Sequence, residues 1–414
     1  MSRVVPFRAV RPAKPFVRQV AAPPYDVLNA AEARELVRDN PLSFLHVEKS
    51  EIDLPDAGGV EDCRIYERAK ENLEGMIHKG ILFQEQSAVF YLYRQQMGGE
   101  RLQTGIVACT DLAEYESGRI LRHEFTRADK EKERTLNIDT VGAQTGPVFM
   151  VYRGRTEIDR VSARVAARPP EYDFTAAGGV RHTVWIISDP AEIREVADGF
   201  ARVETLYIAD GHHRAAAAAN VARLRSARNP AGAGEGEHRL LLSVLFPHDQ
   251  PRIMDYNRAV RDLHGLTEAE FLKRVGDRFR IAENFTEKEP ARPHEFGMYL
   301  NGVWRRLTAS AEILREDDPV AGLDVSLLQE NLLSPILGIR DQRTDPRLEF
   351  VGGIRGMAEL ERLVDRAGFA VAFSLYPPTV AEMMAVADQG KVMPPKSTWF
   401  EPKLLSGLFV HLLR

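Results

Sequence analysis

The pattern of apolar and polar residues along the chain predicts helices and strands in mixed order. Apolar residues at helical spacing predict helices at 30–38 and 65–79, and Asn29 is a suitable N-cap for the first because its short side chain can accept a backbone N–H. Runs rich in apolar, β-branched and aromatic residues predict strands at 88–94, 104–110, 147–152 and 183–187. From 266 onward, helix and strand candidates continue to alternate. The pattern indicates a mixed α/β fold.

A strand, a helix and a second strand follow one another in the middle of the chain. They are predicted at 204–209, 214–228 and 240–246. This succession is typical of a crossover unit in which the two strands pair in parallel. We expect a first region at 1–265, which carries this unit, and a second region at 266–414.

Composition narrows the class of protein. The 414 residues are 44% apolar and 28% charged, which is an ordinary globular mixture. The net charge of -5 lacks the basic excess of a general nucleic-acid binder. Two cysteines, Cys63 and Cys109, cannot build a disulfide framework, and no apolar run reaches the roughly 18 residues of a membrane span. The N-terminus has charges and prolines where a signal peptide requires an apolar stretch. We expect a cytoplasmic protein that acts on small molecules, without nucleic-acid or membrane partners.

The strongest chemical signal is the segment Asp210–Arg214, which reads Asp-Gly-His-His-Arg between the predicted strand and an alanine-rich helix. The glycine permits an unusual backbone angle and close approach of a ligand. Backbone N–H groups at the start of a helix lack intrahelical partners, and together with Arg214 and two imidazoles they form an anion site. Asp210 can hold Mg²⁺, position a hydroxyl or cap the helix. The turn therefore predicts phosphate binding, and the alternative is a capped helix with solvated histidines.

Metal motifs are incomplete in the sequence. His123-Glu124 begins like the motif of zinc proteases, but Arg127 stands where the second histidine is required. His212 and His213 are adjacent, so their side chains diverge, and the two cysteines are distant in sequence. Zinc is therefore not expected at the turn.

Several segments distributed over the chain are distinctive. They are Ala22–Val27, Asn40–His46, His123–Thr126, Tyr207–Arg214, Tyr256–Arg258 and Met393–Thr398, the last continuing to Pro402–Gly407. On these segments the chain resembles the bacterial and archaeal family named domain of unknown function 1015. Asp210–Arg214 also resembles the Gly-x-x-Arg turn that contacts phosphate in the ParB/sulfiredoxin-like superfamily, which includes free-serine kinases. The resemblance implies a ParB/sulfiredoxin-like core, elaborated by additional α/β segments.

Within that superfamily, the free-serine kinase branch fits best. Sulfiredoxin-type enzymes carry a catalytic cysteine directly after the glycine, where this chain has His212. ParB-type proteins add DNA-binding helices and a basic surface, and neither is evident here. The resemblance implies a nucleotide-dependent phosphotransferase acting on a small hydroxylated metabolite. Free L-serine is the expected acceptor, ATP or ADP the expected phosphate donor, and Mg²⁺ the expected cofactor.

The resemblance, combined with phosphoryl-transfer chemistry, suggests roles for individual residues. Such transfer needs charge neutralisation, alignment and a group that accepts the hydroxyl proton. Arg214, His212 and the backbone N–H groups around Gly211 are expected to bind phosphate. Asp210 is expected to hold Mg²⁺ or orient the hydroxyl, and Glu124 is expected to act as the general base.

Other residues are expected at the same site. His213 joins the catalytic group, and Asp26, behind a Pro-Pro-Tyr turn, is the reserve base. Further substrate contacts are expected from both regions of the chain: His123, Asn257, Arg258, Lys396, Ser397 and Lys403. Two alternatives stay open at this point. Transfer in reverse or to water would make the protein a phosphoserine phosphatase, and binding without turnover would make it a nucleotide sensor.

Overall fold

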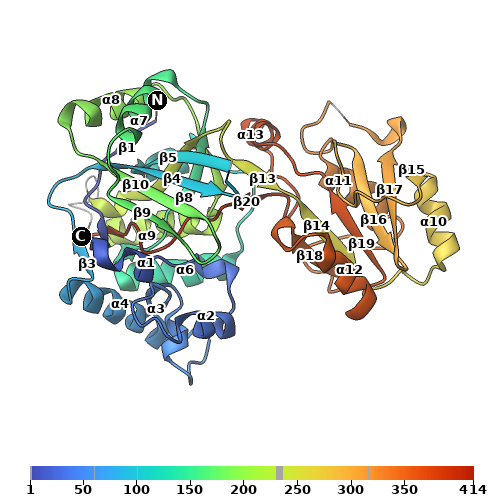
Figure 1. The fold of residues 1–414 in the computed structure, drawn as a ribbon, viewed down its shortest axis with the longest axis horizontal. Helices are drawn as coiled ribbons and strands as arrows, with labels where there is room; N and C mark the ends of the chain where they lie inside the picture. Colours follow the sequence, from blue (N-terminus) through green and yellow to red (C-terminus); the bar gives the residue numbers. More distant parts are fainter. Residues whose placement is uncertain (1, 60, 100, 230–235, 316) are drawn as a thin grey trace. The chain divides into compact units, whose positions relative to one another are not determined.

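The computed structural model describes residues 2–59, 61–99, 101–229, 236–315 and 317–414, and it divides the chain into two compact units (Figure 1). The first unit combines Met1–Pro251 with Pro402–Arg414, and the second is Arg252–Glu401. This division differs from the single boundary expected near 265. The physical reason is strand pairing: the segment after 251 already pairs with strands of the second unit, and the C-terminal segment returns to pair with the first.

The first unit is built on a mixed sheet with the strand order β6-β11-β8-β12-β5-β4-β10-β9, and β1 also pairs with β5. The strands of this sheet are β1 (Val4–Val5), β4 (Phe90–Met97), β5 (Arg101–Asp111), β6 (Ile120–Leu121), β8 (Val148–Tyr152), β9 (Tyr172–Thr175), β10 (Arg181–Ile187), β11 (Leu206–Asp210) and β12 (Leu240–Pro247). Short strand pairs join β2 (Val10–Pro12) to β3 (Leu82–Gln84) and β7 (Ala143–Gln144) to β21 (His411–Leu412). Parallel and antiparallel pairs occur in the same sheet, so the mixed α/β class is confirmed.

The predicted crossover unit is wrong in its pairing. β11 and β12 do not pair with each other, because β8 lies between them. β8 pairs antiparallel with β11 and parallel with β12, so β11 and β12 run in opposite directions. All residues of β8 are buried. This apolar strand lies between β11 and β12, which the sequence pattern had predicted to pair directly. β11 therefore lies second from the edge of the sheet, beside β6.

Local sequence signals explain where the helices of the first unit begin. Asn29 and Glu32 form a reciprocal capping box at α2, and Asp189 caps α8 with Pro190 in its first turn. The predicted helices at 30–38 and 65–79 are confirmed. The helices are α1 (Val17–Val20), α2 (Ala30–Val37), α3 (Leu45–Glu48), α4 (Cys63–His78), α5 (Leu112–Glu116), α6 (Ala128–Val141), α7 (Thr156–Ala166), α8 (Pro190–Ala201) and α9 (His212–Arg228).

In the described part of the chain, no helix is both long enough and apolar enough to cross a bilayer.

The alanine run of α9 determines how closely this helix packs on the sheet. Ala215, Ala218 and Ala219 are buried in the same core cluster as Met150 of β8 and Ile208 of β11. Small side chains let the helix backbone approach the strands, and a larger residue there would overpack the core at a cost of about 1–3 kcal/mol. This packing fixes the start of α9 directly after β11.

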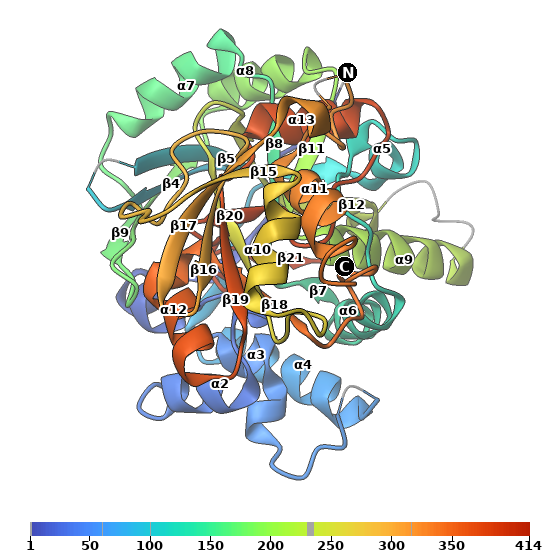
Figure 2. The ribbon, with the colours of Figure 1, turned by 90° about the vertical axis from the view of Figure 1, so that its right-hand side faces the viewer.

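The second unit has its own antiparallel sheet, with the strand order β15-β17-β16-β19-β14-β18. Figure 2 shows β16, β17 and β19 side by side in this sheet. Its core includes Tyr299, Trp304, Leu360 and Phe369. The strands of this sheet are β14 (Tyr256–Val260), β15 (Phe279–Ala282), β16 (Glu295–Leu300), β17 (Val303–Ala309), β18 (Leu348–Gly352) and β19 (Val371–Leu375). In addition, β13 (Arg252–Met254) and β20 (Trp399–Glu401) pair with each other. The helices are α10 (Glu268–Gly276), α11 (Asp324–Leu328), α12 (Met357–Arg366) and α13 (Val380–Asp388).

Candidate functional site

The turn between β11 and α9 has the predicted arrangement of strand, glycine and helix. β11 ends at Asp210, and α9 begins at His212. Gly211 has a φ of 93°, in the left-handed region, where a residue with a side chain would be strained by about 1–3 kcal/mol. The chain can therefore reverse from strand to helix within one residue. The N-terminus of this 17-residue helix carries a partial positive charge and N–H groups without acceptors in the helix itself.

Asp210 is paired with a lysine from the C-terminal segment. Its Oδ2 lies 2.8 Å from Nζ of Lys403, and its Oδ1 accepts the N–H of Gly211 at 2.9 Å. The carbonyl of Lys403 accepts a hydrogen bond from Gln95 of β4, which anchors this segment on the sheet. Burial acts to raise the pKa of the Asp210 carboxyl, but Lys403 outweighs it and lowers this pKa to about 2. Asp210 is thus an ionised, cation-bound carboxylate at neutral pH.

Arg214 lies in the first turn of α9, and its guanidinium is held by backbone and ring contacts. Nη1 donates to the carbonyl of Pro147 at 3.1 Å, and the group lies 5.2 Å from the ring centroid of Tyr25. A Cβ added at Gly146 would come 2.9 Å from Cζ of Arg214, so a side chain there would displace the guanidinium. Nη2 is buried without a hydrogen-bond partner among the described residues, and lies 3.9 Å from Oε2 of Glu48. Burial lowers the pKa of Arg214, but the Glu48 carboxylate and other negative groups more than reverse this.

A pocket beside the turn collects charged groups from distant parts of the sequence. Its walls include Asp26, Asp210, Gly211, Arg214 and Lys403. Two cations and two carboxylates therefore face one space next to a helix N-terminus. This combination can bind an anion and also place a carboxylate against a hydroxyl group.

Two buried charged residues near this pocket, Glu48 and Arg134, are not among those predicted from sequence. Glu48, the last residue of α3, has a side chain only 1% exposed, and its Oε1 has no hydrogen-bond partner in the described structure. Arg134 of α6 stacks 4.1 Å from the ring centroid of Tyr25, and its Nε is also buried and unpartnered within the described residues. Both side chains line a cavity of about 300 Å³, and together with Arg214 they line a smaller hollow next to it. The sequence around Glu48 could have indicated its burial, because this charged residue ends an apolar helical segment whose Leu45 lies in the core.

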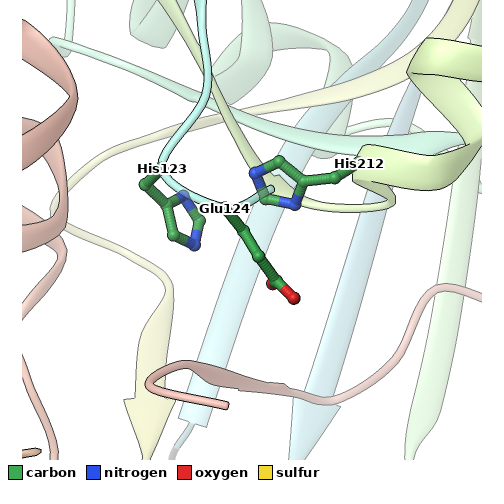
Figure 3. Close-up of side chains that lie close together, drawn as sticks. All are labelled: His123, Glu124 and His212. Atoms are coloured by element: carbon green, nitrogen blue, oxygen red, sulfur yellow. The ribbon is translucent and has the colours of Figure 1, made fainter. Parts of the chain in front are cut away.

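His123, Glu124 and His212 meet at the start of α9 (Figure 3). Each offers one potential ligand atom, and these atoms all lie within 4.8 Å of one another. The two imidazole rings contact edge to face with centroids 4.6 Å apart. Burial lowers the pKa of His123 to about 4 and that of His212 well below its usual value, so both rings are neutral at pH 7.

His213 contacts the loop after β6, whereas His212 lies beside His123 and Glu124. Its Nε2 accepts the backbone N–H of Arg127 at 3.1 Å, which ties the loop after β6 to the first turn of α9. This contact holds the segment that carries His123 and Glu124 against the helix.

Four of the predicted site residues belong to the second unit, where their side chains are engaged locally. Arg258 is fully buried and donates to the carbonyls of Pro395 and Lys396 at 3.3 and 3.1 Å, and burial lowers its pKa to about 9. Ser397 Oγ donates to the carbonyl of Pro394 at 2.6 Å. Asn257 is buried, and its amide oxygen accepts the N–H of Leu375 while its amide nitrogen donates to Asp255. Lys396 Nζ lies 5.8 Å from the ring centroid of Tyr256.

The residues at Asp210 do not fit the expected magnesium site. Lys403 already neutralises one carboxylate oxygen, and the N–H of Gly211 occupies the other. Among the residues that the structure describes, Asp210 belongs to no cluster of three potential metal ligands. Mg²⁺ favours carboxylate and carbonyl oxygens in an octahedral arrangement, and a lysine ammonium at 2.8 Å opposes a cation at the same carboxylate.

Comparison with protein families identifies the relatives of this chain. A sequence model of the family described as "Protein of unknown function (DUF1015)" matches residues 4–326. The chain belongs to this family. The membership inferred from the distributed segments is thereby confirmed. No curated protein matches the chain.

Solved structures similar to this DUF1015 chain are distant. A mutant free serine kinase in complex with AMP is 13% identical, with a TM-score of 0.35, and the match covers 71% of this chain and 86% of that one. A conserved hypothetical protein from Pyrococcus furiosus is 14% identical, with a TM-score of 0.34 and coverage of 74% and 95%. SbnI from Staphylococcus aureus, with its C-terminus truncated, is 11% identical, with a TM-score of 0.36 and coverage of 72% and 85%. At these TM-scores the likeness carries no argument about the present chain.

Proposed function

We propose that this protein is a phosphotransferase that moves a phosphoryl group from ATP or ADP to the hydroxyl of a small metabolite, with free L-serine as the acceptor. The observation that carries the proposal is the convergence of Arg214 and Lys403 on one pocket with Asp210 and Asp26, at the N-terminus of α9. Phosphoryl transfer depends mainly on positioning and on neutralising charge, and this pocket supplies both.

The first turn of α9 and the two cations would hold the phosphate groups. Gly211 lets the backbone come close to a phosphate, and the helix N-terminus favours its negative charge. The Arg214 guanidinium can contact two phosphate oxygens at once, and its orientation is set by Pro147 and Tyr25. The Lys403 ammonium has three donors, so it can contact phosphate and keep its contact with Asp210.

A second cavity favours an amino acid as the acceptor. The smaller hollow shares Glu48 and Arg134 with this cavity and Arg214 with the phosphate pocket. Glu48 and Arg134 present opposite charges to this space of about 300 Å³, and each has a buried polar atom without a partner among the described residues. Arg134 pairs with Glu133 at 2.8 Å, and Glu48 lies 3.9 Å from Arg214. A buried polar atom without a hydrogen bond is still costly, so the remaining atoms indicate a ligand of complementary charge. The ammonium group of a free amino acid would pair with Glu48 and its carboxylate with Arg134. A hydroxylated amino acid of small size, such as serine, fits this charge pattern.

We assign the proton acceptor to Asp26, because it lines the phosphate pocket. In the transfer, the acceptor oxygen forms a bond to the terminal phosphorus, the bond from phosphorus to the nucleotide oxygen breaks, and the hydroxyl proton passes to Asp26. Asp210 is less suited to this role, since Lys403 keeps its pKa low. Glu124, the base expected from sequence, is not among the described residues that line this pocket.

The decisive test is product formation by the full-length protein. Incubation with ATP or ADP, Mg²⁺ and L-serine should yield phosphoserine, detected by mass spectrometry, and omission of serine should abolish it. Release of inorganic phosphate from phosphoserine without nucleotide would instead identify a phosphatase. Tight nucleotide binding without any product would identify a sensor, and either outcome would overturn the proposal.

A further inference from the structure

We propose that His123, Glu124 and His212 bind one divalent transition-metal ion of the zinc type. The three residues come from two segments that sequence motifs do not connect: His123 and Glu124 follow β6, and His212 opens α9. The inference is independent of the proposed phosphoryl transfer. It rests on the distances among these side chains, their burial and the chemistry of their donor atoms.

The geometry needs little adjustment to surround an ion. Bonds from nitrogen or oxygen to zinc are about 2.0–2.2 Å long, so two ligands of one ion are at most about 4.4 Å apart. The three potential ligand atoms already lie within 4.8 Å of one another. A bound ion would require the side chains to move slightly closer, and Figure 3 shows that the three already lie close together.

Hydrogen bonding prepares His123 to act as a ligand. Its Nδ1 lies 3.0 Å from the carbonyl oxygen of Ile208, which can only accept, so Nδ1 must carry the proton. In the neutral ring, Nε2 is then the nitrogen that carries the lone pair. A backbone carbonyl that fixes the second ring nitrogen is the usual partner of a metal-binding histidine. The residue is 2% exposed, so β11 holds the ring in one orientation.

His212 supplies a second, independent sign of a ligand. It is 6% exposed, and its Nε2 is buried with no hydrogen-bond partner in the described part of the chain. Buried imidazole nitrogens are normally paired, because an unpaired polar atom costs about 1–3 kcal/mol. The side chain extends toward His123 and Glu124 (Figure 3). A metal ion bound at this nitrogen would supply the missing partner.

The donor set selects the class of metal. Two imidazoles and one carboxylate suit zinc, cobalt, nickel or iron, whereas magnesium and calcium favour oxygen donors. Three protein ligands also leave at least one coordination position for water or an exogenous oxygen. Glu124 is only partly buried, so solvent reaches this side of the three-residue cluster. Because His212 is two residues from Arg214, an anion bound at the turn lies within the neighbourhood of the metal.

Metal binding can be measured without any substrate. The full-length chain is treated with EDTA, then titrated with Zn²⁺ by calorimetry and with Co²⁺ by visible absorption. We expect one equivalent of each ion, and a Co²⁺ spectrum stronger than that of the aqueous ion. Glu124→Gln should weaken Zn²⁺ binding at least about tenfold, which is about 1.4 kcal/mol. His212→Gln should weaken it further, and a large excess of Mg²⁺ should not displace Zn²⁺.

Asp129→Asn is the matched control, because Asp129 is a nearby exposed carboxylate paired with Arg127 and the charge change is the same. It should bind Zn²⁺ like the unmodified chain. If His212→Gln fails to fold, as judged by circular dichroism, the half-exposed Glu124→Gln variant still decides. Absence of stoichiometric Zn²⁺ binding would overturn the site. Equal Zn²⁺ affinity in Glu124→Gln, Asp129→Asn and the unmodified chain would also overturn it, by placing the ion on other histidines. Since no nucleotide is present, neither result bears on phosphoryl transfer.

Discussion

Lys403 Nζ lies 2.8 Å from Oδ2 of Asp210, although the two residues are 193 positions apart in sequence. The contact exists because the C-terminal segment leaves the second unit and returns to the first, where Val410 pairs with Val10 and β21 pairs with β7. The last segment of the chain therefore supplies a cation to a turn in its middle. The candidate site is complete only after this segment has docked.

Lys403→Met should weaken nucleotide binding at least about tenfold. The substitution keeps most of the unbranched side chain but removes the charge, so Asp210 is left ionised beside the bound phosphate and repels it. The measurement is titration with ATP by calorimetry, with the melting temperature as a check on folding. Lys403→Arg keeps the charge, and its ATP affinity should lie between those of Lys403→Met and the unmodified chain. An affinity equal to that of the unmodified chain would remove Lys403 from the phosphate site.

Arg214→Lys should weaken nucleotide or phosphate binding by about tenfold or more, or roughly 1.4 kcal/mol. Lysine is a point charge and cannot make the paired contacts of a planar guanidinium. It would also lose the contact with the Pro147 carbonyl and the stacking on Tyr25. Unchanged affinity in a folded variant would return the turn to a purely structural role.

Gly146→Ala tests whether the position of Arg214 matters, without changing a charged group. The new methyl would lie 2.9 Å from Cζ of Arg214, so the guanidinium must move. We expect a severalfold loss of nucleotide affinity. Gly178→Ala is the control, because a Cβ there meets no atom within 4 Å. Equal affinities of the two variants would show that the exact placement of Arg214 is unimportant.

Individual helices and turns can be predicted from the sequence more readily than the pairing of strands. The helix caps at Asn29 and the glycine turn at Gly211 are local features, and the structure confirms both. The strands that β11 and β12 pair with depend on the position of β8 in the sheet, and no local sequence pattern encodes that position. The return of the C-terminal segment is likewise a long-range property of the fold.

The candidate site shows the same division. Arg214 and Lys403 stand in distinctive segments and were proposed as site residues from sequence. Arg134 was hidden in a run of charges, which usually indicates a solvated helix face. Its burial comes from tertiary packing against Tyr25. His123 and His212 are 89 positions apart, and only the fold brings them together.

Acid should destabilise the first unit through its buried histidines, of which His182 is the clearest. Burial lowers the pKa of His182 to about 4, and Nδ1 of the ring lies 2.7 Å from the hydroxyl of Tyr93. Between this value and the ordinary pKa of about 6.5, the unfolded chain binds the proton and the folded chain does not. Stability is therefore present above about pH 6.5 and is lost as the pH falls toward 4, by up to about 1.4 kcal/mol per pH unit for one such group.

Urea unfolding at pH 7 and pH 5 measures this effect. His182→Gln removes the titrating group and keeps a polar side chain beside Tyr93, so its unfolding free energy should change less between the two pH values. His123 titrates in the same direction and remains in the variant, so a smaller slope persists. An identical slope in both proteins would exclude His182 as a source of acid sensitivity.

Asp26→Asn should reduce turnover by about 10²–10⁴-fold while leaving nucleotide affinity nearly unchanged, because an amide cannot take the hydroxyl proton but preserves the shape of the pocket wall. Single-turnover assays with saturating ATP and serine measure this, and calorimetry measures the affinity. Glu124→Gln is the contrasting variant, because the charge change is the same and Glu124 is not among the described residues that line the pocket. If Glu124→Gln abolishes turnover while Asp26→Asn remains active, Glu124 is the general base and the assignment to Asp26 fails.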